Sequence, residues 1–289
     1  MPNFSAGRDS SRISDLERSF GDGVRLLDRH ADPDHDRSVF TLAGEAAALS
    51  AALVGGAAEA IRSIEMSAYA GLHPAVGALD VCPVVWLFPR DRDSAGEVAL
   101  ATAAEIGALG VPVFLYGALA TGVDRVERSY FRNGGLSELW LRMESGELRP
   151  DYGPELPHAT AGATLVTARP PLGAFNVELD VGDVEVARAV AAGLRESGGG
   201  LSGVRAIGLL LGNGRAQVST NIHDPAVVTL GTVVERVRGL AAPLGARPVE
   251  AELVGLVPGD ALVDYPEDVP IRDFDSQPRT IEAALADLS

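Results

Sequence analysis

The sequence has no lysine and only one cysteine among its 289 residues. Without lysine, neither a Schiff-base amine nor the lysine of a phosphate-binding P-loop is available. The single cysteine, Cys82, excludes an internal disulfide and a cysteine-cluster metal site, and its apolar neighbours favour a place in the core. No apolar run approaches the roughly 20 residues of a membrane helix, and the first residues lack the apolar core of an export signal. We therefore expect a cytoplasmic protein with no membrane partner.

Positive charge is also scarce. The chain has 24 basic residues, all arginine, against 40 acidic ones, which gives a net charge of −16. A nucleic-acid partner is not expected, because a phosphate backbone requires a basic face. An anionic ligand would have to be held by arginine side chains or backbone N–H groups against an unfavourable overall field.

The second half of the chain has a clear alternation of element types. Its hydrophobic periodicity predicts strand, helix, strand, strand, helix and strand over residues 173–180, 184–197, 204–211, 215–222, 225–240 and 247–258. The sequence GNG at 212–214 suits a tight turn between the two middle strands. This βαββαβ order is the ferredoxin-like arrangement.

The first half nearly repeats this order. Its periodicity predicts helices over residues 10–20, 45–64 and 94–109 and strands over residues 24–31, 38–44, 78–88 and 111–119, followed by a helical stretch over 134–143. The strand that should come first in this order is missing. That strand lies in the middle of a ferredoxin-like sheet, so either the true start lies upstream or another segment fills the gap. We expect an α+β protein of two βαββαβ-type subdomains, residues 1–171 and 172–289, joined at the rigid pair Pro170–Pro171.

His73 is the first candidate for chemistry. Pro74 disfavours the helical region for the residue before it, so His73 should be held extended at a strand entrance. Gly71 and Gly77 are expected to leave space for a ligand. The local sequence leaves two interpretations open, a catalytic imidazole or a loop histidine with satisfied hydrogen bonds.

Two further segments are ambiguous. DPDHDR (32–37) has the acidic composition of a metal loop, but Arg37 and Ala43 stand at the glycine and glutamate positions of a calcium-binding loop. A solvated turn whose carboxylates bond its own backbone is favoured, and no metal site is predicted. Residues 150–164, rich in proline, glycine and small polar residues, are either a linker or a ligand loop.

Several longer motifs carry a resemblance. PNFSAGRD (2–9), LLDRHADPDHDRSVFTLAG (26–44), GLHPAVGALDVCP (71–83), PDYGP (150–154) and TAGATLVTARPPLGAFNVEL (160–179) follow one another in the order seen in glutamate formimidoyltransferases. The chain resembles, from residue 2 to about 265, the formiminotransferase half of formiminotransferase-cyclodeaminase. The resemblance implies two ferredoxin-like subdomains, a folate groove between them and a homodimer.

The resemblance also implies a reaction and its residues. A formimidoyl group would move from N-formimidoyl-L-glutamate to N5 of the co-substrate tetrahydrofolate, in histidine degradation and one-carbon metabolism, without a metal. The catalytic acid–base of the family falls on His73. The folate-binding segment of the family falls on Gly153, Pro154, Glu155, Leu156, Pro157, His158, Ala159, Thr160, Ala161 and Gly162. Arg37 and Arg169 are candidates for binding the substrate carboxylates, or else for pinning the subdomains together.

Two positions depart from the family pattern. Ala6 stands where a glutamate is usual, and Ala75 follows His-Pro where an arginine is common. Without an arginine beside the catalytic histidine, the donor carboxylates are expected to be bound less strongly. Two alternatives therefore stay open: a folate-dependent formyl- or formimidoyltransferase with another donor or acceptor, and a catalytically inactive folate-binding protein.

Overall fold

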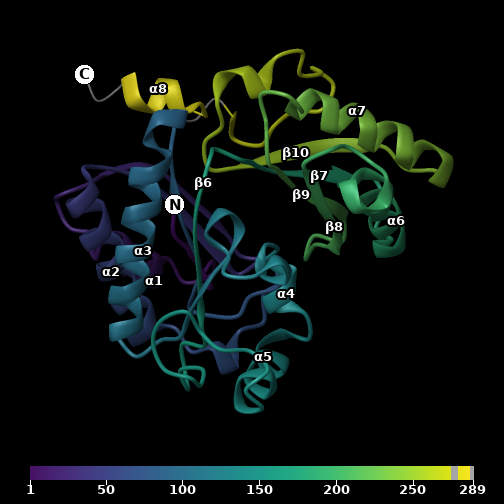
Figure 1. The fold of residues 1–289 in the computed structure, drawn as a ribbon. Coiled ribbons are helices and arrows are strands. Elements are labelled where there is room, and N and C mark those ends of the chain that lie inside the picture. The colour runs from purple at the N-terminus through teal and green to yellow at the C-terminus, as the bar shows by residue number, and fades with distance from the viewer. Residues whose placement is uncertain (275–278, 287–289) are drawn as a thin grey trace. The chain divides into compact units, whose positions relative to one another are not determined.

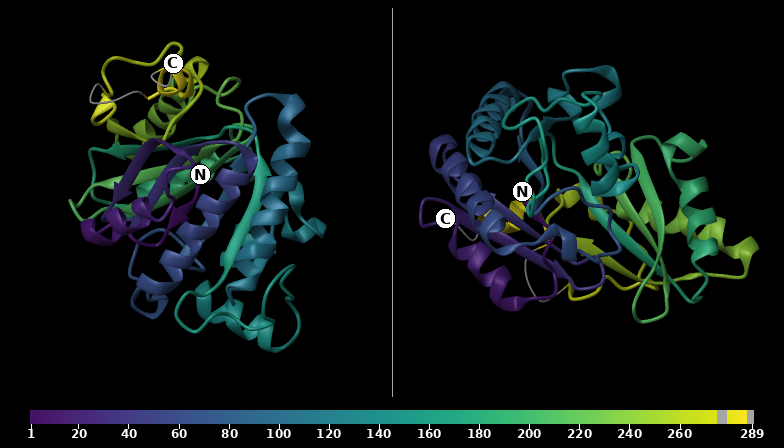
Figure 2. Two further views of the ribbon diagram at one scale, coloured as in Figure 1. Left: turned by 90° about the vertical axis from the view of Figure 1, so that its left-hand side faces the viewer. Right: turned by 90° about the horizontal axis from the view of Figure 1, so that it is seen from below.

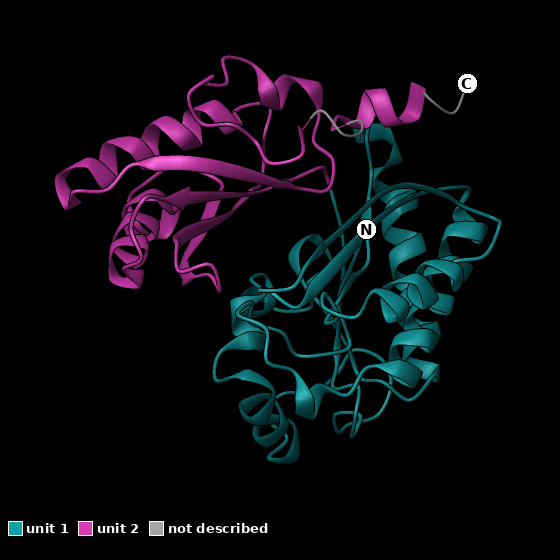
Figure 3. Ribbon diagram, turned by 180° about the vertical axis from the view of Figure 1, so that it is seen from behind, with its two compact units in different colours: residues 1–169 teal, residues 170–289 magenta. Residues whose placement is uncertain are grey.

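The computed structural model describes residues 1–274 and 279–286. The chain forms two compact units, residues 1–169 (unit 1) and residues 170–289 (unit 2), which are coloured separately in Figure 3. Unit 1 contains a six-stranded sheet and unit 2 a four-stranded sheet, each with its own helices. The predicted α+β class with two subdomains is therefore confirmed. Among the described residues, no helix combines the length and the apolar character that crossing a bilayer requires.

The sheet of unit 1 has the strand order β2-β3-β1-β4-β6-β5. Its strands are β1 (Asn3–Phe4), β2 (Arg25–Asp32), β3 (Arg37–Ala43), β4 (Leu79–Val85), β5 (Val113–Leu115) and β6 (Thr164–Arg169). The first four pair antiparallel, whereas β4, β6 and β5 run parallel. The helices are α1 (Ser10–Arg18), α2 (Ala46–Ser63), α3 (Arg92–Ala108), α4 (Ser129–Arg132) and α5 (Gly135–Glu144).

Two groups of helices cover opposite faces of this sheet (Figures 1 and 2). Helices α1, α2 and α3 pack on one face, and their core takes Val113 and Leu115 from β5. Phe114, between those two residues, points to the other face and joins the core under α4 and α5. The alternation follows from the two-residue period of a strand. Cys82 is fully buried in the larger core, as expected.

Strand β1 occupies the place for which the sequence analysis found no strand. It pairs with both β3 and β4, although it has only two residues. Phe4 is completely buried, and its ring centroid lies 5.8 Å from that of Phe40. Strand β6 is also absent from the predicted elements, because the sequence places residues 164–169 in the crossing between the halves. Neither segment shows a strict alternation of polar and apolar residues. Each can be recognised as a strand only from the strands with which it pairs.

Unit 2 follows the predicted order of elements. They are β7 (Gly173–Leu179), α6 (Val184–Leu194), β8 (Val204–Leu210), β9 (Ala216–Ile222), α7 (Leu230–Ala241), β10 (Pro248–Val254) and a further helix α8 (Ile281–Ala286). The sheet is antiparallel throughout, in the order β10-β7-β9-β8. Helix α7 begins five residues later than predicted, because Thr229 caps it by accepting a hydrogen bond from the Thr232 amide at 3.1 Å.

The two faces of the unit 2 sheet differ in polarity. Phe175, Val177 and Leu179 point to the core under α6 and α7, whereas Asn176 and Glu178, which are also buried, point to the face that these helices leave uncovered. There Glu178 and Glu250 both bind the Arg272 guanidinium, at 2.5 and 2.6 Å. This uncovered face is therefore polar, and its charged side chains bind one another.

Candidate active site

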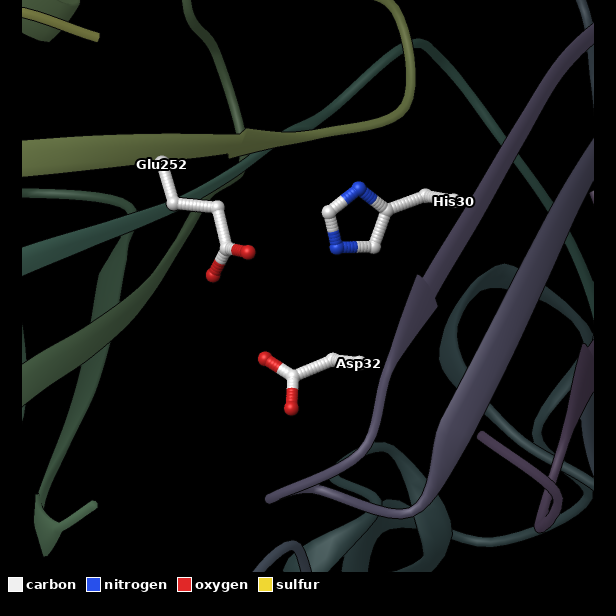
Figure 4. A group of neighbouring side chains, drawn as sticks. All are labelled: His30, Asp32 and Glu252. Atoms are coloured by element: carbon white, nitrogen blue, oxygen red, sulfur yellow. The ribbon is translucent and has the colours of Figure 1, made fainter. Parts of the chain in front are cut away.

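The uncovered part of the unit 1 sheet, opposite α1 to α3, carries the predicted site residues of β2 and β3. Phe40 and Leu42 of β3 point into the helical core, so Arg37, an odd number of residues away, lies on the other face. Asp32 of β2 is directly opposite Arg37 in the antiparallel register. Figure 4 shows the side chains of His30 and Asp32 on the same side of β2; Glu252 in that view belongs to the unit 2 sheet.

Arg37 is held by three polar groups of unit 1. Its Nη1 atom donates to Asp80 Oδ2 at 2.9 Å and lies 3.2 Å from His73 Nδ1. Its Nε and Nη2 atoms donate to Asn3 Oδ1 at 3.2 and 3.1 Å. The side chain is buried. All these partners lie in unit 1, so they give no support to Arg37 as a pin between subdomains.

Asp80 is the single buried carboxylate at the centre of this arrangement. It is fully buried in β4, where Oδ1 accepts the Val76 amide at 2.9 Å and Oδ2 accepts Arg37 and Arg132. Burial by itself would raise the pKa of Asp80, but the charges of Arg132 and Arg37 outweigh it and lower that pKa. Asp80 is therefore ionised at neutral pH and fixes both guanidinium groups.

His73 lies in the loop before β4, with part of its surface exposed. Its Nδ1 atom is 2.9 Å from the Pro74 carbonyl oxygen. The Tyr69 hydroxyl lies 2.8 Å from the His73 carbonyl oxygen and 3.0 Å from that of His35. Burial raises the pKa of Tyr69 to about 12, so the hydroxyl keeps its proton and can donate to this backbone. The loop is thus held by its own side chains.

The electrostatic surroundings of His73 favour the neutral imidazole. Burial, followed by the charges of Arg37 and Arg132, holds its pKa well below the usual value of 6.5. The carbonyl of Pro74 can only accept and the guanidinium of Arg37 can only donate, so Nδ1 serves one of them at a time. When Nδ1–H binds the carbonyl, Nε2 is unprotonated and is available as a base.

Further arginines extend the positive charge away from His73. Arg132 at the end of α4 binds Asp80, and Arg128 precedes it by one helical turn. Burial and the charge of Arg128 act together to lower the pKa of Arg169 to about 10, which still leaves it charged at neutral pH. We call these four residues, Arg37, Arg128, Arg132 and Arg169, the arginine cluster. It unites both predicted carboxylate-binding residues with two that the sequence analysis missed.

The predicted folate segment, residues 153–162, packs directly against the loop that carries His73. The Ala78 amide donates to the Ala161 carbonyl and the Ala163 amide to the Val76 carbonyl, each at 2.9 Å. Within the segment, His158 Nδ1 accepts the Ala161 amide at 3.1 Å, which closes a turn. Residues 153–156 are exposed. The segment is thus an ordered loop beside His73, and its role in binding folate stays a prediction.

Two glycines near His73 have a different function from the predicted one. A Cβ atom on Gly77 would lie 1.8 Å from the Ala163 carbonyl oxygen, and one on Gly71 would lie 2.2 Å from the His35 carbonyl oxygen. On Gly162, where φ is +69°, it would lie 2.2 Å from the Val76 carbonyl oxygen. These glycines allow backbone segments to approach each other. They do not leave space for a ligand, which corrects the expectation for Gly71 and Gly77.

The turn at 32–37 has the hydrogen bonds expected of a solvated turn. Asp32 Oδ1 accepts the amides of Asp34 and His35, at 2.7 and 2.8 Å. Asp36 Oδ1 accepts the Gly7 amide at 2.8 Å. Asp32 therefore shapes its own turn, as the favoured interpretation predicted, whereas Asp36 binds the backbone of another segment. His35 is buried, so the turn is only partly solvated. The turn also brings the His35 ring to 6.0 Å from the His73 ring, centroid to centroid.

One of the missed residues left a signal in the sequence. Asp80 interrupts the apolar run ALDVCPVVWLF, and a carboxylate inside a buried strand needs a cationic partner. That rule predicts that arginines converge on Asp80, but it does not say which ones. An imidazole beside several guanidinium groups and one buried carboxylate can perform acid–base chemistry on an anionic substrate.

The chain belongs to the formiminotransferase family. Residues 1–169 match the formiminotransferase domain, N-terminal subdomain, and residues 174–268 match the formiminotransferase domain. The chain is 35% identical over 290 residues to a glutamate formimidoyltransferase of Streptococcus pyogenes serotype M1, covering 99% of this chain and 97% of that protein. A glutamate formimidoyltransferase of Thermoplasma acidophilum is 34% identical over 270 residues, 91% of this chain and 89% of that protein.

Longer relatives match as well. The formimidoyltransferase-cyclodeaminase of Sus scrofa is 36% identical over 274 residues, which are 91% of this chain but only 50% of that protein. The similarity to the bifunctional proteins is therefore confined to half of their length, whereas the similarity to the shorter glutamate formimidoyltransferases spans nearly all of it.

Proposed function

We propose that this protein is a glutamate formimidoyltransferase, a one-carbon transferase that moves the formimidoyl group of N-formimidoyl-L-glutamate to N5 of tetrahydrofolate. The proposal rests on the similarity to proteins of that name over 99% and 91% of the chain. The geometry supports it, because His73 lies beside the arginine cluster and next to the loop 153–162. Tetrahydrofolate enters as a co-substrate.

The proposed mechanism uses His73 as the proton carrier. The N5 lone pair of tetrahydrofolate attacks the amidine carbon of the donor and forms a C–N bond, which gives a tetrahedral intermediate. His73 takes the proton from N5 and gives it to the glutamate nitrogen as the bond from that nitrogen to carbon breaks. L-Glutamate and 5-formimidoyltetrahydrofolate leave. A neutral imidazole near neutral pH suits both steps.

Substrate positioning would come from the segments around His73. We propose that residues 153–162 bind folate, and that the arginine cluster binds carboxylate groups, with Arg37 and Arg169 as members. Proton transfer by a positioned imidazole accounts for roughly 10²–10⁴-fold in rate. Bringing the two substrates together has to supply much of the remainder.

The finer architecture is part of the same proposal. In unit 2 the first and third strands are central and the second and fourth are at the edges, which supports a ferredoxin-like subdomain. In unit 1, β1 to β4 have the corresponding order, with β6 and β5 added beyond β4. The boundary at residue 171, the folate groove between the subdomains, the homodimer and the cytoplasmic location stay predictions.

The direct test is turnover by the purified full chain. Tetrahydrofolate and N-formimidoyl-L-glutamate are supplied together, and 5-formimidoyltetrahydrofolate is measured by its absorbance while released L-glutamate is measured separately. The two products should form in equal amounts, and omitting either substrate should abolish both. Turnover with 5-formyltetrahydrofolate or a non-glutamate amidine, and none with formimidoylglutamate, would favour another folate transferase. Tight folate binding without turnover on any donor would indicate a folate-binding protein.

A further inference from the structure

Arg128 differs from the other members of the arginine cluster in what its guanidinium binds. Arg37 and Arg132 share Asp80, whereas no hydrogen bond or ion pair within the described residues engages the Arg128 side chain. The side chain is partly buried. Burial lowers the pKa of Arg128, and the charges of Arg132 and Arg37 act in the same direction, against the opposing influence of Tyr116 and Asp80. A guanidinium in such a place lacks the anion that would offset the cost of removing it from water.

Arg132 provides a second donor without a partner. Its Nη2 atom binds Asp80, but its Nε–H is buried and has no hydrogen-bond acceptor in the described part of the chain. A buried donor left unsatisfied in this way costs free energy. Arg128 is the N-cap residue of α4 and has helical dihedral angles, so its side chain and that of Arg132, one turn later, leave the same side.

The charges at this place do not balance. Arg37, Arg128 and Arg132 carry three positive charges, and Asp80 is the carboxylate that binds two of them. His73 is neutral at pH 7 and supplies no negative charge. The imbalance occurs in a chain whose net charge is −16, in which carboxylates are abundant. A further anion beside Arg128 would offset this excess of positive charge.

We propose that Arg128 and Arg132 bind a carboxylate of the glutamate part of the formimidoyl donor, with Arg128 as the residue that determines donor specificity. This inference rests on the proposed function. The anion is a carboxylate because both substrates carry that group, and a guanidinium fork matches it with two parallel hydrogen bonds.

The position of the cluster favours the donor over folate as the source of this carboxylate. Arg37, which shares Asp80 with Arg132, lies 3.2 Å from His73. In the donor, the α-carboxylate is two bonds from the nitrogen that must accept the proton. In tetrahydrofolate, a benzoyl ring separates N5 from the glutamate tail. A carboxylate bound next to the catalytic imidazole therefore fits the donor.

The test separates the two sources by kinetics. In Arg128→Gln, the KM for formimidoylglutamate should rise about 10–100-fold, the loss expected for one charge-assisted pair. The KM for tetrahydrofolate should change less than twofold, and Arg128→Lys should recover part of the loss because it keeps the charge without the fork. Arg236→Gln, on the exposed side of α7, makes the same charge change in unit 2 and should leave both constants unchanged.

A binding measurement makes the inference independent of turnover. Titration calorimetry measures the affinity of the full-length wild-type protein and of each full-length variant for L-glutamate and for pteroate, which lacks the glutamate tail. L-Glutamate affinity should fall in Arg128→Gln while pteroate affinity stays the same; this result supports the carboxylate site even if the wild-type protein fails to turn over. An unchanged donor KM and unchanged L-glutamate affinity would overturn the inference, as would a loss confined to tetrahydrofolate.

Discussion

The two sheets each have a face that their long helices leave uncovered, and the charges on those faces are organised in opposite ways. In unit 2, the carboxylates of Glu178 and Glu250 bind the guanidinium groups of Arg272 and Arg215. Both acids contact both arginines, and Glu252 also lies 3.9 Å from Arg272, so each of these arginines has carboxylate partners. In unit 1, one carboxylate, Asp80, serves Arg37 and Arg132 while Arg128 has no acidic partner among the described residues.

The difference distinguishes a structural network from a ligand site. A buried charge that is fully paired satisfies the fold and needs nothing further. A partly buried cation in excess costs free energy in the free protein, which a bound anion recovers. Although unit 2 has more carboxylates on its uncovered face, the unit 1 face has the chemistry for binding an anionic substrate and moving a proton. The predictions below test this contrast, from the largest expected effect to the smallest.

Removing the imidazole should have the largest effect. We expect His73→Ala to lower kcat by roughly 10²–10⁴-fold, because the proton carrier is lost. Steady-state kinetics with both substrates measures the change, and circular dichroism and thermal unfolding check that the fold is retained. A kcat within threefold of the wild-type value in a folded variant would refute the role of His73.

Asp80 and Glu178, two buried carboxylates, should differ in their contribution to stability. Asp80→Asn leaves Arg37 and Arg132 without a counter-charge and should lower the free energy of unfolding by about 3–5 kcal/mol. Glu178→Gln, in the matched network, leaves Glu250 to bind Arg272 and should cost about 1–3 kcal/mol. Urea unfolding of both variants at pH 7 gives the comparison. Equal losses would show that charge balance does not distinguish the two faces.

A glycine at the junction of the His73 loop and residues 158–163 should not tolerate a methyl group. In Gly77→Ala the new Cβ would lie 1.8 Å from the Ala163 carbonyl oxygen, so we expect destabilisation of about 3 kcal/mol and weaker folate binding. Gly96→Ala, within α3, is the control, because its Cβ would meet only Leu119 at 3.9 Å. The control should gain about 0.5–1 kcal/mol from helix propensity. Unchanged folate affinity in Gly77→Ala would separate this junction from folate binding.

The smallest effect concerns pH. The groups that act on His73 are Arg37, Arg132, His35 and the Pro74 carbonyl, and together with burial they lower its pKa. Because the base must be neutral, kcat/KM should fall only at pH values below 6.5. In Arg132→Gln the midpoint of this acid limb should move upward towards 6.5, and in Arg236→Gln it should not move. A midpoint at or above 6.5 in the wild type would contradict the surroundings described for His73.

The same shift has a consequence for stability. The folded-state pKa of His73 lies below the unfolded value of about 6.5, so the unfolded chain binds more protons between the two. The contribution of His73 is therefore fully present above pH 6.5 and is lost as the pH falls towards the folded-state pKa. His73→Gln should flatten the dependence of unfolding free energy on pH in that window.

Some parts of the fold were predictable because their signal is local. In unit 2, each strand and helix up to β10 has its own hydrophobic period, so the order of these elements could be read directly, apart from the start of α7; helix α8 was not predicted. Strand β1 has two residues and β6 follows a loop rich in small residues, so neither has a period long enough to detect. Both are strands because β3, β4 and β5 offer hydrogen-bonding edges to them.

The sequence by itself determined which chemistry is available: with no lysine, every cationic side chain except the five histidines is an arginine, and the His-Pro motif marks the imidazole. The tertiary structure alone decided which groups surround that imidazole. Asn3, Arg37, Asp80 and Arg132 are far apart in the chain and carry no shared local pattern. They meet because a buried carboxylate and buried guanidinium groups must find each other once the sheet has removed them from water.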